Sequence, residues 1–161
     1  MFIENPVPWP GTTKCALSIK FDLDADSVLP IAQPDKADTY VLPQSNLRYG
    51  PEVSIPRICK IDEHFGIRQT FFVPGWCVER YPRAHETILR DGHEIGHQGY
   101  LREPPNQQSA EDERYWFKRA LNAYDRCLGI RPSGYRVPLN ESSKKSLCRC
   151  SWRRVLSMTR Q

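Results

Sequence analysis

Apolar and polar residues alternate in several short stretches of the chain, which is the pattern of half-buried β-strands. Leu17, Ile19 and Phe21 alternate with polar neighbours, and residues 69–74 form an apolar, partly aromatic run that ends at a proline. The pattern predicts four strands in all, at residues 15–21, 69–74, 93–97 and 133–137.

Between these strands, apolar residues recur at the spacing of one face of a helix. We expect helices over residues 55–65 and 80–90, and a long third helix that begins after Ser109 and ends at Gly129. Residues 27–52, rich in Pro, Asp, Gln and Ser, are expected to form a long loop, which in a compact domain is typically functional.

This alternation of strands and helices predicts an α/β fold with a parallel sheet or barrel. The length of 161 residues fits one domain. A mean hydropathy of -0.61 and the absence of a long apolar run argue against a membrane protein. The acidic, proline-broken start does not resemble a signal peptide, so we expect a cytoplasmic protein.

Charge and cysteine content narrow the possible partners. The net charge of +4 comes from residues 142–161, which carry six basic residues and no acid, so a nucleic-acid-binding face is not expected. The six cysteines include no C-x-x-C pair, so we expect free thiols instead of disulfides or a cysteine metal site. The oligomeric state is left open.

Carboxylates and imidazoles form a candidate metal site. Asp22 and Asp24 follow the first predicted strand, and His93 and His97 bracket the third. Two imidazoles and one carboxylate are a common set of zinc ligands, and a further carboxylate can act as a base. We therefore expect a divalent metal, with zinc preferred to cobalt or nickel.

Residues 93–97 also match H-E-x-x-H, the signature of zincin proteases, which requires a helix. Asp91 and Gly92 precede this stretch, and Gly96 lies within it. Because glycine disfavours helix, an extended conformation is expected, and the protease remains a minor alternative.

Taken together, these stretches resemble the polysaccharide deacetylase (NodB-homology) family, in its branch of peptidoglycan-deacetylase-like and cyclic-imide-hydrolase-like proteins. The resemblance covers about residues 8–147 and is specific at residues 21–27, 48–50, 69–76, 92–97 and 134–138. It implies the N-terminal portion of a distorted (β/α)7 barrel, incomplete at its C-terminus, with the domain at residues 1–147.

The resemblance also implies roles for individual residues. Asp22 resembles the catalytic base and Arg136 the arginine that orients it. A metal triad is expected from Asp24, His93 and His97. The implied reaction is metal-dependent hydrolysis of a carbon–nitrogen bond in an N-acetylated glycan, a cyclic imide or a ureide. The alternative is a truncated, non-catalytic remnant of such an enzyme.

The chain departs from the family pattern at two positions. Proteins of this branch often read Gly-His-His-Gly-Tyr-Leu-His-Glu after the metal strand, whereas this chain has Gln98 and Arg102 in place of two of those histidines. The departure is expected to affect substrate contacts more than metal binding.

Residues 148–161 have neither helical nor strand pattern. Reading their codons in the alternative frame permits a leucine-rich helix followed by Gly-Phe-Glu-Tyr-Asp, which is what the family has at this point. The tail is therefore interpreted as a frameshift product, and the literal chain is expected to be poorly soluble or inactive.

Overall fold

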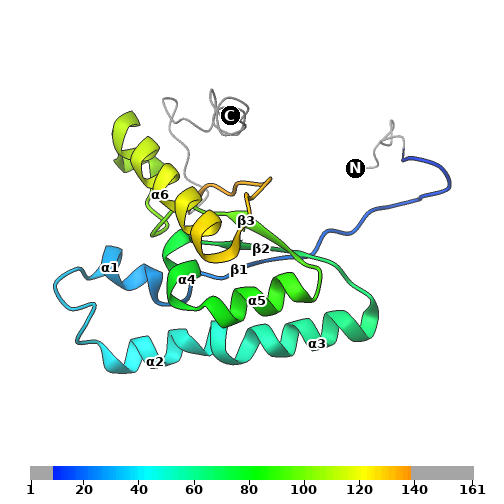
Figure 1. The fold of residues 1–161 in the computed structure, drawn as a ribbon, viewed down its shortest axis with the longest axis horizontal. Coiled ribbons are helices and arrows are strands. Elements are labelled where there is room, and N and C mark those ends of the chain that lie inside the picture. Colours follow the sequence, from blue (N-terminus) through cyan, green and yellow to red (C-terminus); the bar gives the residue numbers. More distant parts are fainter. Residues whose placement is uncertain (1–8, 139–161) are drawn as a thin grey trace, which may run out of the picture.

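The computed structural model describes residues 9–138, which form a three-stranded parallel sheet flanked by helices (Figure 1). The strands are β1 (Lys20–Asp22), β2 (Thr70–Val73) and β3 (Glu94–His97), in the spatial order β1-β2-β3. Phe71 at the centre of β2 is level with Phe21 and with Ile95. The predicted α/β class with a parallel sheet is confirmed.

In the sequence, helices follow each of the three strands. The segments α3 and α5 pack side by side, and α6 packs against α4 (Figure 1). In chain order the helical segments are the 3-10 turn η1 (Ala25–Val28), α1 (Leu29–Ala32), α2 (Val41–Tyr49), the π-turn η2 (Gly50–Ser54), α3 (Ile55–Phe65), α4 (Gly75–Arg80), α5 (Pro82–Arg90), the 3-10 turn η3 (Pro105–Gln107) and α6 (Ala110–Leu128).

Two of the predicted helices end as their sequences indicate. Gly66 after α3 and Gly129 after α6 have φ angles of 64° and 63°, in the left-handed region that glycine adopts without steric cost. The hydroxyl of Ser109 accepts a hydrogen bond from the backbone N–H of Asp112 at 3.1 Å, which satisfies a donor at the start of α6. These boundaries are confirmed.

The apolar core is centred on β2. Phe71 and Val73 are fully buried, and Tyr124 of α6 packs in the same cluster. A Cβ atom at Gly75 would lie 2.8 Å from the Cα atom of Ala120, so α4 and α6 approach each other too closely for a side chain at that point. The core thus fixes both helices relative to the sheet.

Four predicted segments differ in the structure. The first strand begins only at Lys20, and Leu17 is 86% exposed, because β2 offers no partner before Thr70. Residues 27–52 contain helices instead of a plain loop. The helix predicted at 80–90 is present as α5 but begins at Pro82, and a further helix that was not predicted, α4, ends just before the non-helical Tyr81. The fourth strand is reduced to a single bridge between His97 and Tyr135.

Among residues 9–138, no helix is both long enough and apolar enough to cross a membrane. The four cysteines described there are free thiols, of which Cys59 and Cys77 are buried and Cys15 and Cys127 are exposed. The segment interpreted as a frameshift product, residues 148–161, lies outside the described residues.

Candidate functional site

The carboxyl ends of the three parallel strands meet at one edge of the sheet, where α/β proteins commonly bind ligands. Asp22 ends β1, Asp24 follows two residues later, and Gln98 follows β3 directly. Arg136 is brought to this edge by a bridge beside His97, whose carbonyl oxygen accepts a hydrogen bond from the Arg136 N–H at 2.9 Å.

Asp22 and Arg136 form an ion pair across the sheet. The guanidinium of Arg136 lies over the ring of Phe72, 4.2 Å from its centroid, in a cation–π contact. Asp22, Phe72 and Gly96 are paired across the three strands and therefore share one face of the sheet. The predicted pairing of Asp22 with Arg136 is present, on a face where both side chains retain some exposure.

The neighbouring carboxylate, Asp24, has two partners from the segment that follows β3. Nη1 of Arg102 lies 3.0 Å from Oδ2 of Asp24. The side-chain amide of Gln98, oriented so that its nitrogen is the donor, donates to Oδ1 of Asp24 at 3.2 Å and to the carbonyl oxygen of Phe72 at 3.1 Å. Both carboxylate oxygens of Asp24 are thus in polar contact with groups of this chain.

Burial raises the pKa of the Asp24 carboxyl above its ordinary value, although Arg102 opposes this shift. The nearby negative charge of Asp22 raises the pKa further, and the positive charge of Arg136 lowers it. The two carboxylates and the two guanidiniums therefore form one electrostatic group at the sheet edge.

The segment that presents Arg102 is closely held. Oε1 of Glu103 accepts from the N–H of Leu101 at 2.7 Å, and Oε2 accepts from the N–H of Tyr100 at 3.1 Å. The carbonyl oxygens of Gly99 and Tyr100 accept from backbone N–H groups at the start of α4. Arg102 itself has a φ of 68°, which is uncommon for a residue with a side chain.

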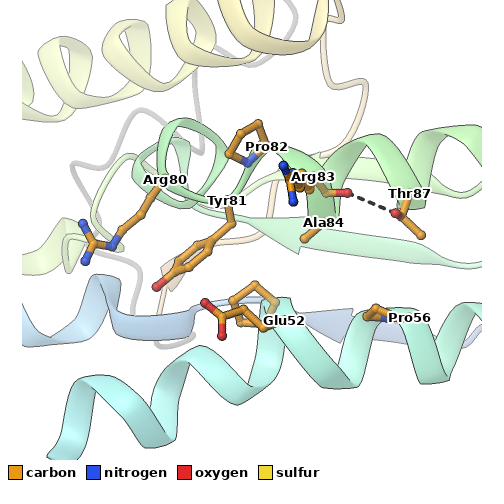
Figure 2. A pocket seen from close by; sticks show the side chains of 9 residues that line it. Glu52, Pro56, Arg80, Tyr81, Pro82, Arg83, Ala84 and Thr87 are labelled. Carbon is orange, nitrogen blue, oxygen red and sulfur yellow. Dashed lines mark hydrogen bonds between the residues drawn. The ribbon is translucent and has the colours of Figure 1, made fainter. Parts of the chain in front are cut away.

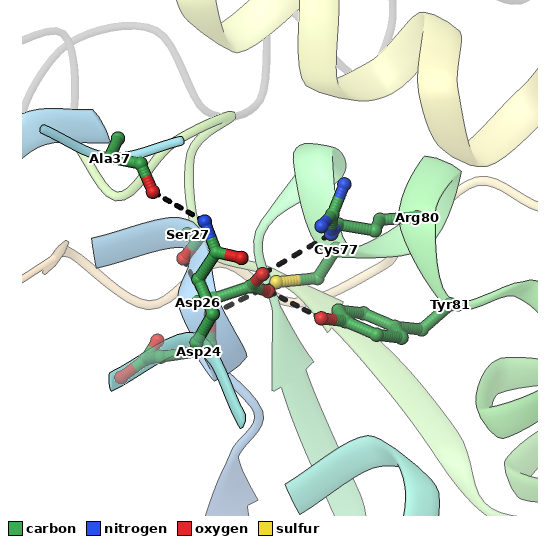
Figure 3. Close-up of polar contacts among 8 residues, drawn as sticks. Asp24, Asp26, Ser27, Ala37, Cys77, Arg80 and Tyr81 are labelled. Atoms are coloured by element: carbon green, nitrogen blue, oxygen red, sulfur yellow. Dashed lines mark hydrogen bonds and ion pairs between the residues drawn. The ribbon is translucent and has the colours of Figure 1, made fainter. Parts of the chain in front are cut away.

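Asp26 lies within η1, the 3-10 turn that begins after Asp24. Figure 3 shows Asp26 facing Arg80 and Tyr81. Its carboxylate accepts from the Tyr81 hydroxyl at 2.6 Å and pairs with Nε of Arg80 at 3.2 Å. These contacts join η1 to the end of α4. Since Asp26 is also only 3% exposed, we assign it a structural role.

His97 lies in the core under α6. Its ring stacks on Phe117 at a centroid distance of 4.1 Å. Nδ1 accepts from the N–H of Gly99 at 3.0 Å, and Nε2 lies 3.3 Å from the carbonyl oxygen of Phe117. Burial lowers the pKa of His97 to about 4, which favours a neutral ring. Both ring nitrogens contact the backbone around the imidazole.

His93 precedes β3 and lies at the opposite edge of the sheet. It is buried, with Nε2 3.7 Å from Oδ2 of Asp62, and lines a cavity of about 230 Å³ that also involves Cys59 and Arg68. A strand advances about 3.3 Å per residue, so four residues separate His93 from His97 by roughly 13 Å. The extended conformation also removes the helix that a zincin site requires.

The residues present do not fit the divalent metal that the resemblance implies. The structure separates His93 from Asp24, and the ring of His97 is engaged under α6. No group of three or more His, Cys, Asp or Glu side chains that could hold a metal ion occurs in the described part of the chain. The predicted triad of Asp24, His93 and His97 is therefore not assembled.

A larger cavity, of about 540 Å³, lies away from this edge, between the start of α3 and α5 (Figure 2). Glu52, Pro56, Tyr81 and Thr87 are among the residues that line it. None of the predicted site residues lines this cavity.

Gln98 and Arg102 were not predicted to contact Asp24. The one sequence signal for these contacts was the family pattern, in which histidines occupy positions 98 and 102. The pattern of apolar residues gave no reason to assign Gln98 or Arg102 to the site. The structure shows that both side chains lie against Asp24.

Comparison with known proteins adds a family context. The sequence profile described as polysaccharide deacetylase matches residues 48–150. The peptidoglycan deacetylase of Helicobacter pylori is 30% identical over 95 residues, which are 59% of this chain and 32% of that protein. The chain thus spans about a third of this curated relative.

Solved structures show the same fold. A protein from Mycobacterium smegmatis described as a polysaccharide deacetylase is 39% identical, with a TM-score of 0.82 over 86% of this chain and 48% of its own. Puue allantoinase is 24% identical, with a TM-score of 0.71 over 82% of this chain and 50% of its own. At that identity the second comparison supports the fold alone.

Proposed function

Because the chain belongs to the polysaccharide deacetylase family, we propose that its sheet edge acts on the carbon–nitrogen bond of an N-acylated sugar or a cyclic imide. The observation that supports this proposal is the ion pair between Asp22 and Arg136 at the carboxyl edge of the sheet. It gives a hydrolytic base a fixed position beside a cation, on a face with some access to solvent.

In the proposed reaction, a water oxygen adds to the carbonyl carbon and Asp22 accepts the proton that the water loses. The carbon–nitrogen bond then breaks, and the nitrogen receives the proton that Asp22 took from the water. The nitrogen leaves as the amine of the sugar or, for a cyclic imide, as the amide of the opened ring. Arg136 positions the Asp22 carboxylate through the ion pair and is itself held over the Phe72 ring. No step passes through a metal, because residues 9–138 do not bring together a set of metal ligands.

The proposal is tested by following hydrolysis with the full chain. An N-acetylated chito-oligosaccharide and a cyclic imide are incubated separately, and acetate release or ring opening is measured. Asp22→Asn should lower the rate by about 100-fold or more, because a positioned base contributes 10²–10⁴-fold. The matched control is Asp125→Asn, an exposed acid of α6, which should leave the rate unchanged. Equal rates for Asp22→Asn and wild type would contradict the assignment of the base.

A second candidate is a non-catalytic protein that binds such a substrate without turnover. The ion pair between Arg102 and Asp24 favours it, since this carboxylate is already paired within the chain. Binding of the same two compounds is measured by calorimetry. Binding without product selects the second candidate, whereas product formation that depends on Asp22 selects the first.

A further inference from the structure

The surroundings of Asp24 combine a buried carboxylate with a cation supplied by the chain. Nη1 of Arg102 lies 3.0 Å from one carboxylate oxygen, and the amide of Gln98 lies 3.2 Å from the other. A carboxylate that ligates a metal needs a lone pair directed at the ion and further donor atoms around it. Here the groups beside Asp24 are hydrogen-bond donors instead of metal ligands.

The backbone supports this arrangement. Arg102 is held at a φ of 68°, in the left-handed region that is sterically unfavourable for a residue with a side chain. Glu103 fixes the turn by accepting from two N–H groups, and Gln98 is 1% exposed. A surface arginine that met Asp24 by chance would not need a closely held turn.

Neither of the two predicted metal-binding histidines contacts Asp24. His97 directs both ring nitrogens toward backbone groups under α6, and His93 lies at the other edge of the sheet. The positive charge next to Asp24 therefore comes from Arg102, with Arg136 further off beside Asp22.

We infer that Arg102 is a permanent replacement for a metal cation at Asp24, so that this chain is metal-independent at the site. The inference includes a reversal: imidazoles introduced at Gln98 and Arg102 would lie beside Asp24 and provide two nitrogens and one carboxylate, the set that binds Zn²⁺ or Co²⁺. It goes beyond the proposed hydrolysis and does not depend on it.

The test measures Co²⁺ binding by the full 161-residue chain, free of any histidine tag. Equilibrium dialysis with elemental analysis gives the stoichiometry, and visible absorption of Co²⁺ reports coordination by the protein. The variants are Gln98→His with Arg102→His, the same pair with Asp24→Asn, the same pair with His93→Gln, and Asp24→Asn alone. Circular dichroism verifies the fold of each.

Wild type should bind no stoichiometric Co²⁺, and the double-histidine variant should bind about one ion per chain. Adding Asp24→Asn should abolish that binding, whereas adding His93→Gln should leave it intact. Stoichiometric Co²⁺ on wild type that is lost with Asp24→Asn would overturn the inference, as would a folded double-histidine variant that binds none. Should the variant not fold, the wild-type measurement decides alone. Since turnover is not read, an inactive protein leaves this result unaffected.

Discussion

Gly96 lies against the ring of Phe72, which in turn lies under the guanidinium of Arg136. A Cβ atom at Gly96 would be 2.5 Å from the nearest atom of the Phe72 ring, which is too close for two carbon atoms that are not bonded to each other. The missing side chain at Gly96 therefore lets the ring support Arg136, and through it Asp22.

Gly96→Ala is expected to destabilise the fold by about 1–3 kcal/mol, because the Phe72 ring has to move out of its place. The free energy of unfolding is measured by urea titration. Gly134→Ala is the matched control, since its Cβ would lie at an ordinary 3.8 Å from the same ring, and should be nearly neutral. Adding Phe72→Leu to Gly96→Ala should recover part of the loss. An unchanged unfolding midpoint for Gly96→Ala would argue against this contact.

At the scale of the elements, Asp26 connects two segments that are far apart in sequence. The carboxylate belongs to η1, and its partners Arg80 and Tyr81 lie at the end of α4. Cys77 of α4 also donates to the carbonyl oxygen of Asp24 at 3.0 Å. These contacts position the turn that follows β1, and therefore Asp24 at the carboxyl edge of the sheet.

Asp26→Ala should lower the free energy of unfolding by about 1–3 kcal/mol, because the partly buried Tyr81 hydroxyl and the Arg80 guanidinium lose the buried carboxylate that they contact. Asp38→Ala, at an exposed position, serves as the matched control and should be neutral within error. Thermal unfolding followed by circular dichroism measures both. A midpoint for Asp26→Ala equal to that of the control would show that the link between η1 and α4 contributes nothing.

The predicted elements succeeded where local chemistry decides the outcome. The end of α3 at Gly66 and the start of α6 after Ser109 follow from backbone preferences that need no tertiary partner. The first strand was predicted too long. Its length depends on where its partner β2 begins, and the alternation of Leu17 and Ile19 carries no information about that partner.

The site was only partly predictable for a related reason. The pairing of Asp22 with Arg136 was implied by the family resemblance, and the structure has these two side chains in an ion pair. His93 and His97 were paired by a ligand spacing that suits a helix, although the same stretch was predicted to be extended. In a strand that spacing places the two rings at opposite ends, and the contacts of Arg102 depend on a turn that no periodicity reveals.

For the whole molecule, buried histidine makes stability depend on pH. His85 of α5 is fully buried, and burial lowers its pKa from 6.5 to about 4. In this range the unfolded chain binds a proton that the folded chain does not. The contribution to stability is complete above pH 6.5 and is lost as the pH decreases toward 4.

His85→Leu should flatten the pH dependence of unfolding between pH 6.5 and 4 by up to about 3 kcal/mol, since one pKa unit corresponds to 1.36 kcal/mol. Urea titrations at several pH values measure the slope for each protein. His64→Leu, on an exposed part of α3, is the control and should keep the wild-type slope. His97, whose pKa is also lowered to about 4, keeps its own part of the pH dependence in this variant. A His85→Leu variant with the full wild-type slope would show that His85 contributes none of it.

The guanidinium beside Asp24 has a consequence for how the protein responds to its surroundings. The stabilisation that a bound ion gives a fold decreases as the free concentration of the ion decreases, so starvation or a chelator can remove it. A cation that is covalently part of the chain is present from synthesis onward at fixed stoichiometry. The Asp24 region therefore needs no ion uptake for its assembly, and its stability does not depend on the supply of any ion.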